Sequence, residues 1–351
     1  MRKKKLRLLT VFLSACTMLL LAPLTVSAAD VTPGGGTGGA DGNGSLGGAT
    51  GGTQPGGRNT AAGGETIDLS QPSTWPNSAV PITISNCPGQ CKGHTITGTF
   101  DSANISHDTL EAIVLVNGGP HNIILKDATI NLESATGNSS KLNIRPFALN
   151  GADGASATVN LSLEGNNTLK SVGSKAGLHV PAGSSLNIVK GTAQSKLDVS
   201  GGHTGAGIGG DGYSANCGSI MIDAAGSTIN ATGGNGGCGI GSGPDGLAGR
   251  ITIKNGTGKA QGGDGDDTSN ISAGAGIGSI LSPYNDVIIN GGSVSAIGGR
   301  TNRNGGSIQA YGIASSSLSS DGNSVTMTAN SISGDTGKFN GVVWGEAGNE
   351  D

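Results

Sequence analysis

Short segments in which apolar and polar residues alternate recur along the chain, with glycine-rich stretches between them. In "RITIK" (250–254) a threonine separates Ile251 from Ile253, and "VNLSL" (159–163) has the same alternation. Successive side chains of a β-strand point to opposite faces, so each segment predicts a strand with one apolar face. We expect no substantial helix, because "HDTLEAIVLV" (107–116) continues into β-branched residues and is predicted to be strand.

These segments belong to a repeat whose most regular copies contain GAGIG or a variant of it. One apolar residue marks each copy, and successive marks lie 30, 32, 37 and 36 residues apart: Leu178, Ile208, Ile240, Ile277 and Ile313. An alternating second strand follows each mark: "LNIV" (186–189), "SIMID" (219–223), "RITIK" (250–254), "DVIIN" (286–290) and "SVTMT" (324–328). A third strand follows after a Gly or Asn turn: "KLDVSGG" (196–202), "TINATGG" (228–234), "GKAQGG" (258–263), "SVSAIGG" (293–299) and "NSISGDTG" (330–337).

Three short strands per repeat predict one coil of a single-stranded parallel β-helix, an all-β solenoid. Stacking one coil on the next pairs the strand edges and buries ladders of aliphatic side chains, one of which is expected to contain Ile208, Ile240 and Ile277. We predict seven or eight coils over residues 65–351, with Trp75 and Trp344 capping the two ends.

The first 28 residues predict a secretory signal peptide. Basic residues from Arg2 to Arg7 precede an apolar run that ends in Val26-Ser27-Ala28, and cleavage is expected after Ala28. An uncleaved anchor and lipidation at Cys16, within Leu13-Ser14-Ala15-Cys16, are the alternatives. We therefore expect a secreted, extracellular or cell-surface bacterial protein with no membrane insertion after cleavage.

Composition agrees with a solenoid preceded by a tether. The 67 glycines and the 3% of aromatic residues suit a chain that turns often, and residues 29–64 contain too few apolar residues to form a core, which predicts a flexible linker. Loss of the signal peptide removes five basic residues and no acidic one, so the formal net charge goes from −4 to −9. Such a chain is a poor partner for nucleic acid.

The stretch "GAGIGGDGY" (205–213) matches the dinucleotide-binding pattern at Gly205, Gly207 and Gly210. That pattern requires a helix after it and occurs once per site. Here a loop and another strand are expected, and the stretch recurs in successive repeats. We therefore interpret these glycines as turn residues of a coil and predict no nucleotide cofactor.

Four cysteines remain in the exported chain, and disulfides are the default expectation there. We predict one bridge between Cys87 and Cys91, across a Pro-Gly turn, and a second between Cys217 and Cys238. A metal site is the alternative for these cysteines, but no Cys-x-x-Cys is present and the histidines do not cluster at ligand spacings.

The stretch "GGDGDD" (262–267) resembles the start of a calcium-binding nonapeptide, although Ser269 stands where the pattern has a large apolar residue and no tandem copy follows. Asp264, Asp266 and Asp267 are candidates for weak Ca²⁺ binding through oxygen ligands. A solvated acidic turn is the preferred interpretation, so no cofactor is predicted beyond this possible ion.

Residues 176–315 resemble the repeat proteins with the pattern GAGIG…ITI…V-x-A-x-GG that occur among secreted and surface proteins of bacteria, within the pectate-lyase-like β-helices. The resemblance rests on core and turn positions such as "GAGIG" and "RITIK". It implies a right-handed parallel β-helix with a carbohydrate-binding or adhesin-like role, and it identifies no catalytic residue.

The residues themselves also favour binding over catalysis. A glycosidase needs two carboxylates about 5 to 10 Å apart, whereas most acids here are predicted in turns, and Arg250, Lys254 and Arg300 form no group suited to a lyase. No catalytic residue is predicted. A polysaccharide lyase or hydrolase is the alternative function, and a structural surface or matrix component is the second.

Three tyrosines are the candidate carbohydrate-binding residues. Tyr213 and Tyr284 follow the marks Ile208 and Ile277 by five and seven residues, so both could protrude from the same turn of the solenoid, and Tyr311 is the third. The predicted partner is a glycan or another cell-surface ligand, and the sequence leaves the oligomeric state open.

Overall fold

The computed structural model describes residues 59–60, 64–71, 81–85, 93–100, 102, 105, 110–133, 143–150, 156–280, 285–303, 306–319, 326–329 and 332–338. All of them lie in one compact unit, Gln54–Asp351. The signal peptide, Trp75, Trp344, Tyr284 and the pair Cys87 and Cys91 lie outside the described residues. The described part of the chain contains no helix, and hence none that could cross a membrane.

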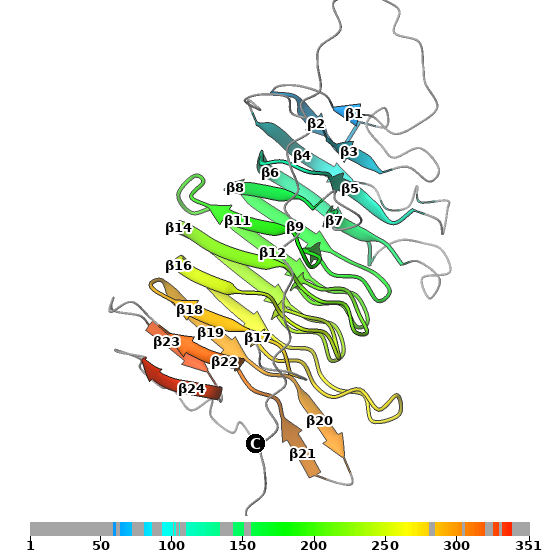
Figure 1. The fold of residues 1–351 in the computed structure, drawn as a ribbon. Coiled ribbons are helices and arrows are strands. Elements are labelled where there is room, and N and C mark those ends of the chain that lie inside the picture. The colour runs from blue at the N-terminus through cyan, green and yellow to red at the C-terminus, as the bar shows by residue number, and fades with distance from the viewer. Residues whose placement is uncertain are drawn as a thin grey trace, which may run out of the picture. The chain divides into compact units, whose positions relative to one another are not determined.

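The fold is an all-β, right-handed parallel β-helix, as predicted. Its strands stack in parallel columns, and the chain visits three columns in turn before it starts the next coil (Figure 1). The first column contains β1 (Asn59–Thr60), β3 (Ile82–Ile84), β5 (Ala112–Val116), β7 (Arg145–Leu149), β10 (Leu178–His179), β13 (Ile208–Gly209), β15 (Ile240–Gly241), β17 (Ile277–Gly278), the start of β22 (Ile313–Ser319) and the start of β24 (Ile332–Lys338).

The second and third columns are partly formed by strands long enough to contribute to both. The second contains β2 (Thr66–Asp68), β4 (His94–Phe100), β6 (His121–Asn131), β8 (Thr158–Glu164), β11 (Ser185–Val189), β14 (Ser219–Thr232), β16 (Ile251–Gln261), β18 (Asp286–Ile289) and the end of β22. Eight segments form the third, namely the ends of β4 and β6, then β9 (Asn166–Lys170), β12 (Lys196–Ser200), the ends of β14 and β16, β19 (Ser293–Ile297) and β23 (Thr326–Ala329).

Aliphatic ladders run through the interior of the solenoid. The predicted ladder is confirmed, because Ile208 pairs in register with Ile240 and Ile240 with Ile277. Leu178 and Ile313 extend it in the two directions. All five side chains are buried, and each buried side chain of this size contributes about 1.5–3 kcal/mol. The ladder therefore holds each coil to its neighbours.

The glycine after each inward isoleucine has a structural role. The φ angles of Gly209, Gly241 and Gly278 are 138°, 146° and 112°, which L side chains rarely adopt. A Cβ atom on any of them would also collide with a carbonyl oxygen of the next coil. The stretch that matches the dinucleotide pattern leads into a loop and then β14, so these glycines are turn residues of the coil.

The structure differs from the prediction at the start of the solenoid. Asn59 and Thr60 were assigned to the flexible linker, but they form β1 and pair in parallel with β3. This pairing joins backbone groups only, so it needs no apolar alternation in the sequence.

A second difference lies in the last coil. "SVTMT" (324–328) was predicted in the second column, but β23, which begins at Thr326, pairs with β19 in the third. β22 instead runs through the first and second columns, with Leu318 paired to Val287. β24 then lies on β22, so Ile332–Lys338, predicted as part of the third strand "NSISGDTG" (330–337), begins a new coil and does not complete the last one.

The inward and outward faces of β16 allow a direct test of the packing. Ile253 is buried beneath the next coil, whereas its neighbour Thr252 faces outward and is partly exposed. We expect Ile253→Ala to lower the free energy of unfolding by about 2–5 kcal/mol, because it leaves a cavity in the interior. Thr252→Ala should change it by less than about 1 kcal/mol. Urea unfolding followed by circular dichroism measures both, and equal losses would contradict the assigned faces.

Candidate functional site

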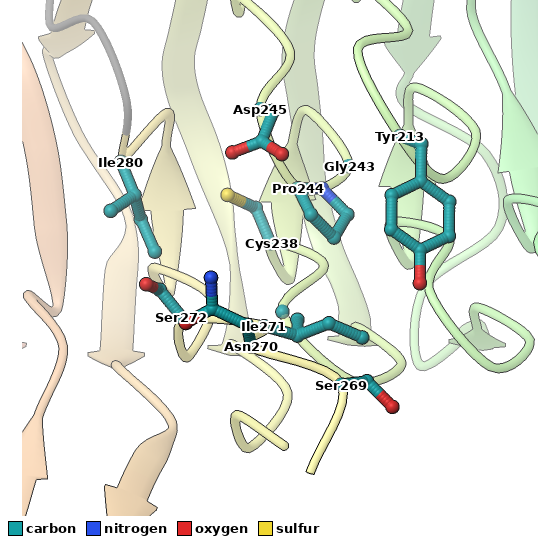
Figure 2. A pocket seen from close by; sticks show the side chains of 11 residues that line it. Tyr213, Cys238, Gly243, Pro244, Asp245, Ser269, Asn270, Ile271, Ser272 and Ile280 are labelled. Atoms are coloured by element: carbon teal, nitrogen blue, oxygen red, sulfur yellow. The ribbon is translucent and has the colours of Figure 1, made fainter. Parts of the chain in front are cut away.

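A pocket with a volume of about 300 Å³ lies beside Tyr213. Figure 2 shows Tyr213 on one side of it and Ile280 on the other, with Pro244, Asp245 and Cys238 between them. Its other described lining residues are Gly236, Gly243, Ser269, Asn270, Ile271 and Ser272. The lining mixes apolar side chains with a few polar groups, as small-molecule sites do.

Loops of successive coils form the walls of this pocket. Tyr213 lies in the turn after β13, Pro244 and Asp245 lie in the turn after β15, and Ile280 follows β17. The remaining wall is the loop 269–272, which comes before β17. Because β13, β15 and β17 stack in register, they hold three turns of equivalent position side by side.

Unusual backbone conformations gather at this pocket. Among the described residues, six that are not glycine have positive φ, and four of these lie in its walls or directly beside them: Tyr213 (48°), Ser214 (56°), Asp245 (60°) and Asn270 (55°). Such conformations cost about 1–3 kcal/mol each and are found most often at functional sites. Here they are maintained by surrounding contacts, since Ser214 N–H donates to the Pro244 carbonyl at 2.8 Å and Gly212 N–H to the Ser174 carbonyl at 2.8 Å.

The loop 266–272 is shaped by Asp266. Its carboxylate accepts hydrogen bonds from Thr268 N–H at 2.9 Å, Thr268 Oγ1 at 2.6 Å and Ser269 Oγ at 2.8 Å. These bonds, with the Thr268 side chain contributing most, lower the pKa of Asp266 to about 2.

The calcium candidates fit the acidic-turn interpretation. Asp264 accepts a hydrogen bond from Arg300 N–H at 2.8 Å, and the carboxylate of Asp266 is used within its own loop. Within the described ranges, no three His, Cys, Asp or Glu side chains gather where they could hold a metal ion. Weak Ca²⁺ binding by Asp264, Asp266 and Asp267 stays a prediction.

Cys238 lies at the floor of the pocket and does not form the predicted disulfide. It and Cys217 are both free and buried. Cys217 packs in the interior core, whereas Cys238 belongs to a separate apolar cluster with Ala275, Ala314 and Ile280. Burial raises the pKa of Cys217 to about 12 and that of Cys238 to about 11, so both are neutral thiols at neutral pH.

A buried ionic cluster holds the start of the turn that carries Tyr213. Both carboxylate oxygens of Asp211 accept hydrogen bonds from Arg145, one of them also from Lys175 Nζ at 3.0 Å, and the other from Ala176 N–H at 3.0 Å. His179 Nε2 lies 3.8 Å from Asp211 Oδ1. The four side chains come from three successive coils and are only 9–19% exposed.

The cluster sets the charge states of its members. Burial alone would raise the pKa of Asp211, but the positive charges of His179 when protonated, Arg145 and Lys175 outweigh it and lower that pKa to about 2. Burial lowers the pKa of His179 to about 4, and Arg145 and Lys175 add to this effect while Asp211 opposes it. At neutral pH, Asp211 is therefore ionised and His179 neutral. A carboxylate whose two oxygens accept this many hydrogen bonds is suited to holding a turn in place and poorly suited to acting as a base.

This cluster was missed in the sequence, where Asp211 was counted as an ordinary turn acid. A signal was present for one member only, because His179 stands where the next three coils have glycine. His179 pairs in register with Gly209, and Asp211 occupies a position held by Gly243 in the next coil. At the position of Asp211 the other coils have Pro181, Gly243, Ile280 and Ser316, so the pattern there gives no comparable signal.

The structure separates the three candidate tyrosines. Tyr213 lines the pocket and is 53% exposed. Tyr311 is also exposed, but it is not among the residues that line the pocket. Tyr284 lies outside the described residues, so the proposed pairing of Tyr213 with Tyr284 stays a prediction.

Comparison with known proteins adds no family to these observations. No family model, curated protein or solved structure matches this chain.

Neutralising Asp211 should destabilise the protein strongly. Asp211→Asn leaves Arg145 and Lys175 without their counter-charge in a buried setting, and we expect a loss of about 3–5 kcal/mol. Asp198→Asn is the control, because the Asp198–Lys196 pair is exposed and should contribute about 0–1 kcal/mol. Urea unfolding at pH 7 measures both losses, and similar values for the two variants would contradict the cost of leaving Arg145 and Lys175 buried without their counter-charge.

His179 should make the protein sensitive to acid. The folded-state pKa of about 4 lies below the ordinary histidine pKa of 6.5, so the unfolded chain binds a proton first as the pH falls. The folded state therefore loses roughly 3 kcal/mol of stability from this residue between pH 6.5 and 4. The drop in unfolding free energy over this range should be smaller in His179→Gln than in the wild type. If His179→Gln had the same pH dependence as the wild type, the assignment of His179 as a buried neutral residue would be wrong.

Proposed function

We propose that the protein is a non-enzymatic, secreted or cell-surface β-helix that binds a glycan in the pocket beside Tyr213. The observation that carries this proposal is the half-exposed ring of Tyr213, which stands at the edge of a pocket of about 300 Å³. An aromatic ring offers a sugar an apolar face, and Tyr also carries a hydroxyl for hydrogen bonding. The volume lies at the lower end of the range for small-molecule sites.

The backbone of the pocket supports a binding role. Tyr213, Asp245 and Asn270 hold strained conformations that packed coils maintain, so the site is organised before a ligand arrives. Preorganisation lowers the entropy cost of binding. The resemblance of residues 176–315 to secreted GAGIG-repeat proteins implies a role of the same kind.

The chemistry of the pocket favours binding over cleavage. Asp245 is the one carboxylate among the described residues that line it, whereas glycoside hydrolysis uses two. The nearby carboxylate of Asp211 is buried and accepts hydrogen bonds from Arg145, Lys175 and Ala176. These features support a site that holds a sugar without acting on it.

Removal of the Tyr213 ring tests the proposal. A glycan array probed with the purified full chain should give reproducible hits, and Tyr213→Ala should weaken binding to those glycans at least tenfold because the stacking surface is lost. Tyr311→Ala is the matched control, since Tyr311 is exposed outside the pocket, and it should bind like the wild type.

Circular dichroism and urea unfolding establish that both tyrosine variants are folded. Equal binding by the wild type and Tyr213→Ala, or a blank array, would contradict the proposal. Release of reducing ends or unsaturated products from common polysaccharides would show that the protein is an enzyme.

A further inference from the structure

The described side chains that line the pocket beside Tyr213 carry charge of one sign only, which is negative. Of the described residues that line it, Asp245 is the one acid, and none is Lys, Arg or His. The thiol of Cys238 is neutral, because burial raises its pKa to about 11. Asp266 and Asp267 add negative charge to the loop that forms the opposite wall. Among the described lining residues, an occupant therefore meets one acidic side chain and no basic one.

Asp245 also differs from the other acids near the pocket, because no described residue pairs with its carboxylate. Asp211 is paired with Arg145 and Lys175, Asp264 accepts a bond from Arg300 N–H, and Asp266 is used by Thr268 and Ser269. No hydrogen bond or ion pair joins the carboxylate of Asp245 to any described residue. Its positive φ of 60° holds it in the turn after β15, between Ile280 and Tyr213 as Figure 2 shows.

From this arrangement we infer that the pocket selects a sugar with a free amino group, bound as its ammonium form between Asp245 and Tyr213. The ammonium group supplies the positive charge that Asp245 lacks, through a charge-assisted hydrogen bond. The face of the Tyr213 ring attracts a cation as well. The same carboxylate repels uronic acids and other anionic sugars. This inference rests on the proposed glycan-binding function and names its ligand class.

Three sugar probes separate the inference from the general function. Isothermal titration calorimetry with the full chain compares an oligomer of glucosamine, the same oligomer N-acetylated, and an oligogalacturonate. We expect the aminated oligomer to bind at least tenfold more tightly than the acetylated one, and the oligogalacturonate to show no binding. Raising the salt concentration should weaken binding of the aminated oligomer more than that of the acetylated one.

Two variants test whether Asp245 causes the preference for the aminated oligomer. Asp245→Asn keeps the size of the side chain and should reduce affinity for the aminated oligomer to that for the acetylated one, with the acetylated oligomer little affected. Asp198→Asn removes an equal charge on the outer face of β12 and should leave both affinities unchanged. Tyr213→Ala should weaken both oligomers.

The possible failures are distinguishable. Equal affinity for the aminated and acetylated oligomers, or an unchanged preference in Asp245→Asn, overturns the amino-sugar inference while a loss in Tyr213→Ala still supports glycan binding. A preference that Asp198→Asn abolishes equally reflects net charge and also overturns it. Absence of binding to all three oligomers overturns the inference, and the glycan array then decides the proposed function by itself.

Discussion

The structure depends on the parallel pairing of each coil with the next. In the first column, β10, β13, β15 and β17 are only two residues long, so few backbone hydrogen bonds hold each strand. The ladder from Leu178 to Ile313 adds buried apolar area at the same place. This arrangement brings the coils close together. The residue after each inward isoleucine must therefore be a glycine wherever its Cβ would meet the carbonyl oxygen of the next coil. The last coil shows the limit of that requirement, since Ala314 stands in the same column without a positive φ.

Regular stacking leaves the turns outside the strands free to differ, and the candidate site uses this freedom. The position after the inward residue is His179 in one coil and glycine in the next three, and the turn that follows β13 carries Asp211 where the other coils have uncharged residues. Asp211 joins three coils through Arg145 and Lys175. Burial of these charges has a desolvation cost, so the cluster is better understood as fixing one conformation of the turn than as a large gain in stability. Tyr213 lies two residues later in the same turn, so fixing Asp211 also fixes the position of Tyr213.

The repeat could be predicted from the sequence because its signal is carried by single apolar residues at a nearly constant spacing. Prediction fails where this signal weakens. Leu318 is alone in a run of serines, and the second strand of the last coil was therefore assigned to the next apolar segment, "SVTMT" (324–328). The cluster at Asp211 was missed for a different reason. Arg145 and Asp211 are 66 residues apart, and only the number and register of the coils between them bring the two together. The Cys217–Cys238 disulfide failed for a related reason, because nearness along a solenoid does not determine which side of the wall a side chain faces.

A perfectly regular solenoid presents the same surface at every coil, and a specific ligand needs a place where the repeat is broken. In this protein, three such interruptions of the repeat lie at the same place. The turn with Tyr213, the turn with Asp245 and the loop with Asn270 are each irregular, each strained, and each a wall of one pocket. Strain of this kind persists only if the surrounding structure enforces it. The bond from Ser214 N–H to the Pro244 carbonyl joins the turns of Tyr213 and Asp245, and the backbone bonds between Asp266 and Ile271 close the loop that carries Asn270. The carboxylate of Asp266 accepts hydrogen bonds that shape one wall, whereas the carboxylate of Asp245 bonds to no described residue. That division between acids that build the site and one that faces its occupant gives the pocket a chemical preference.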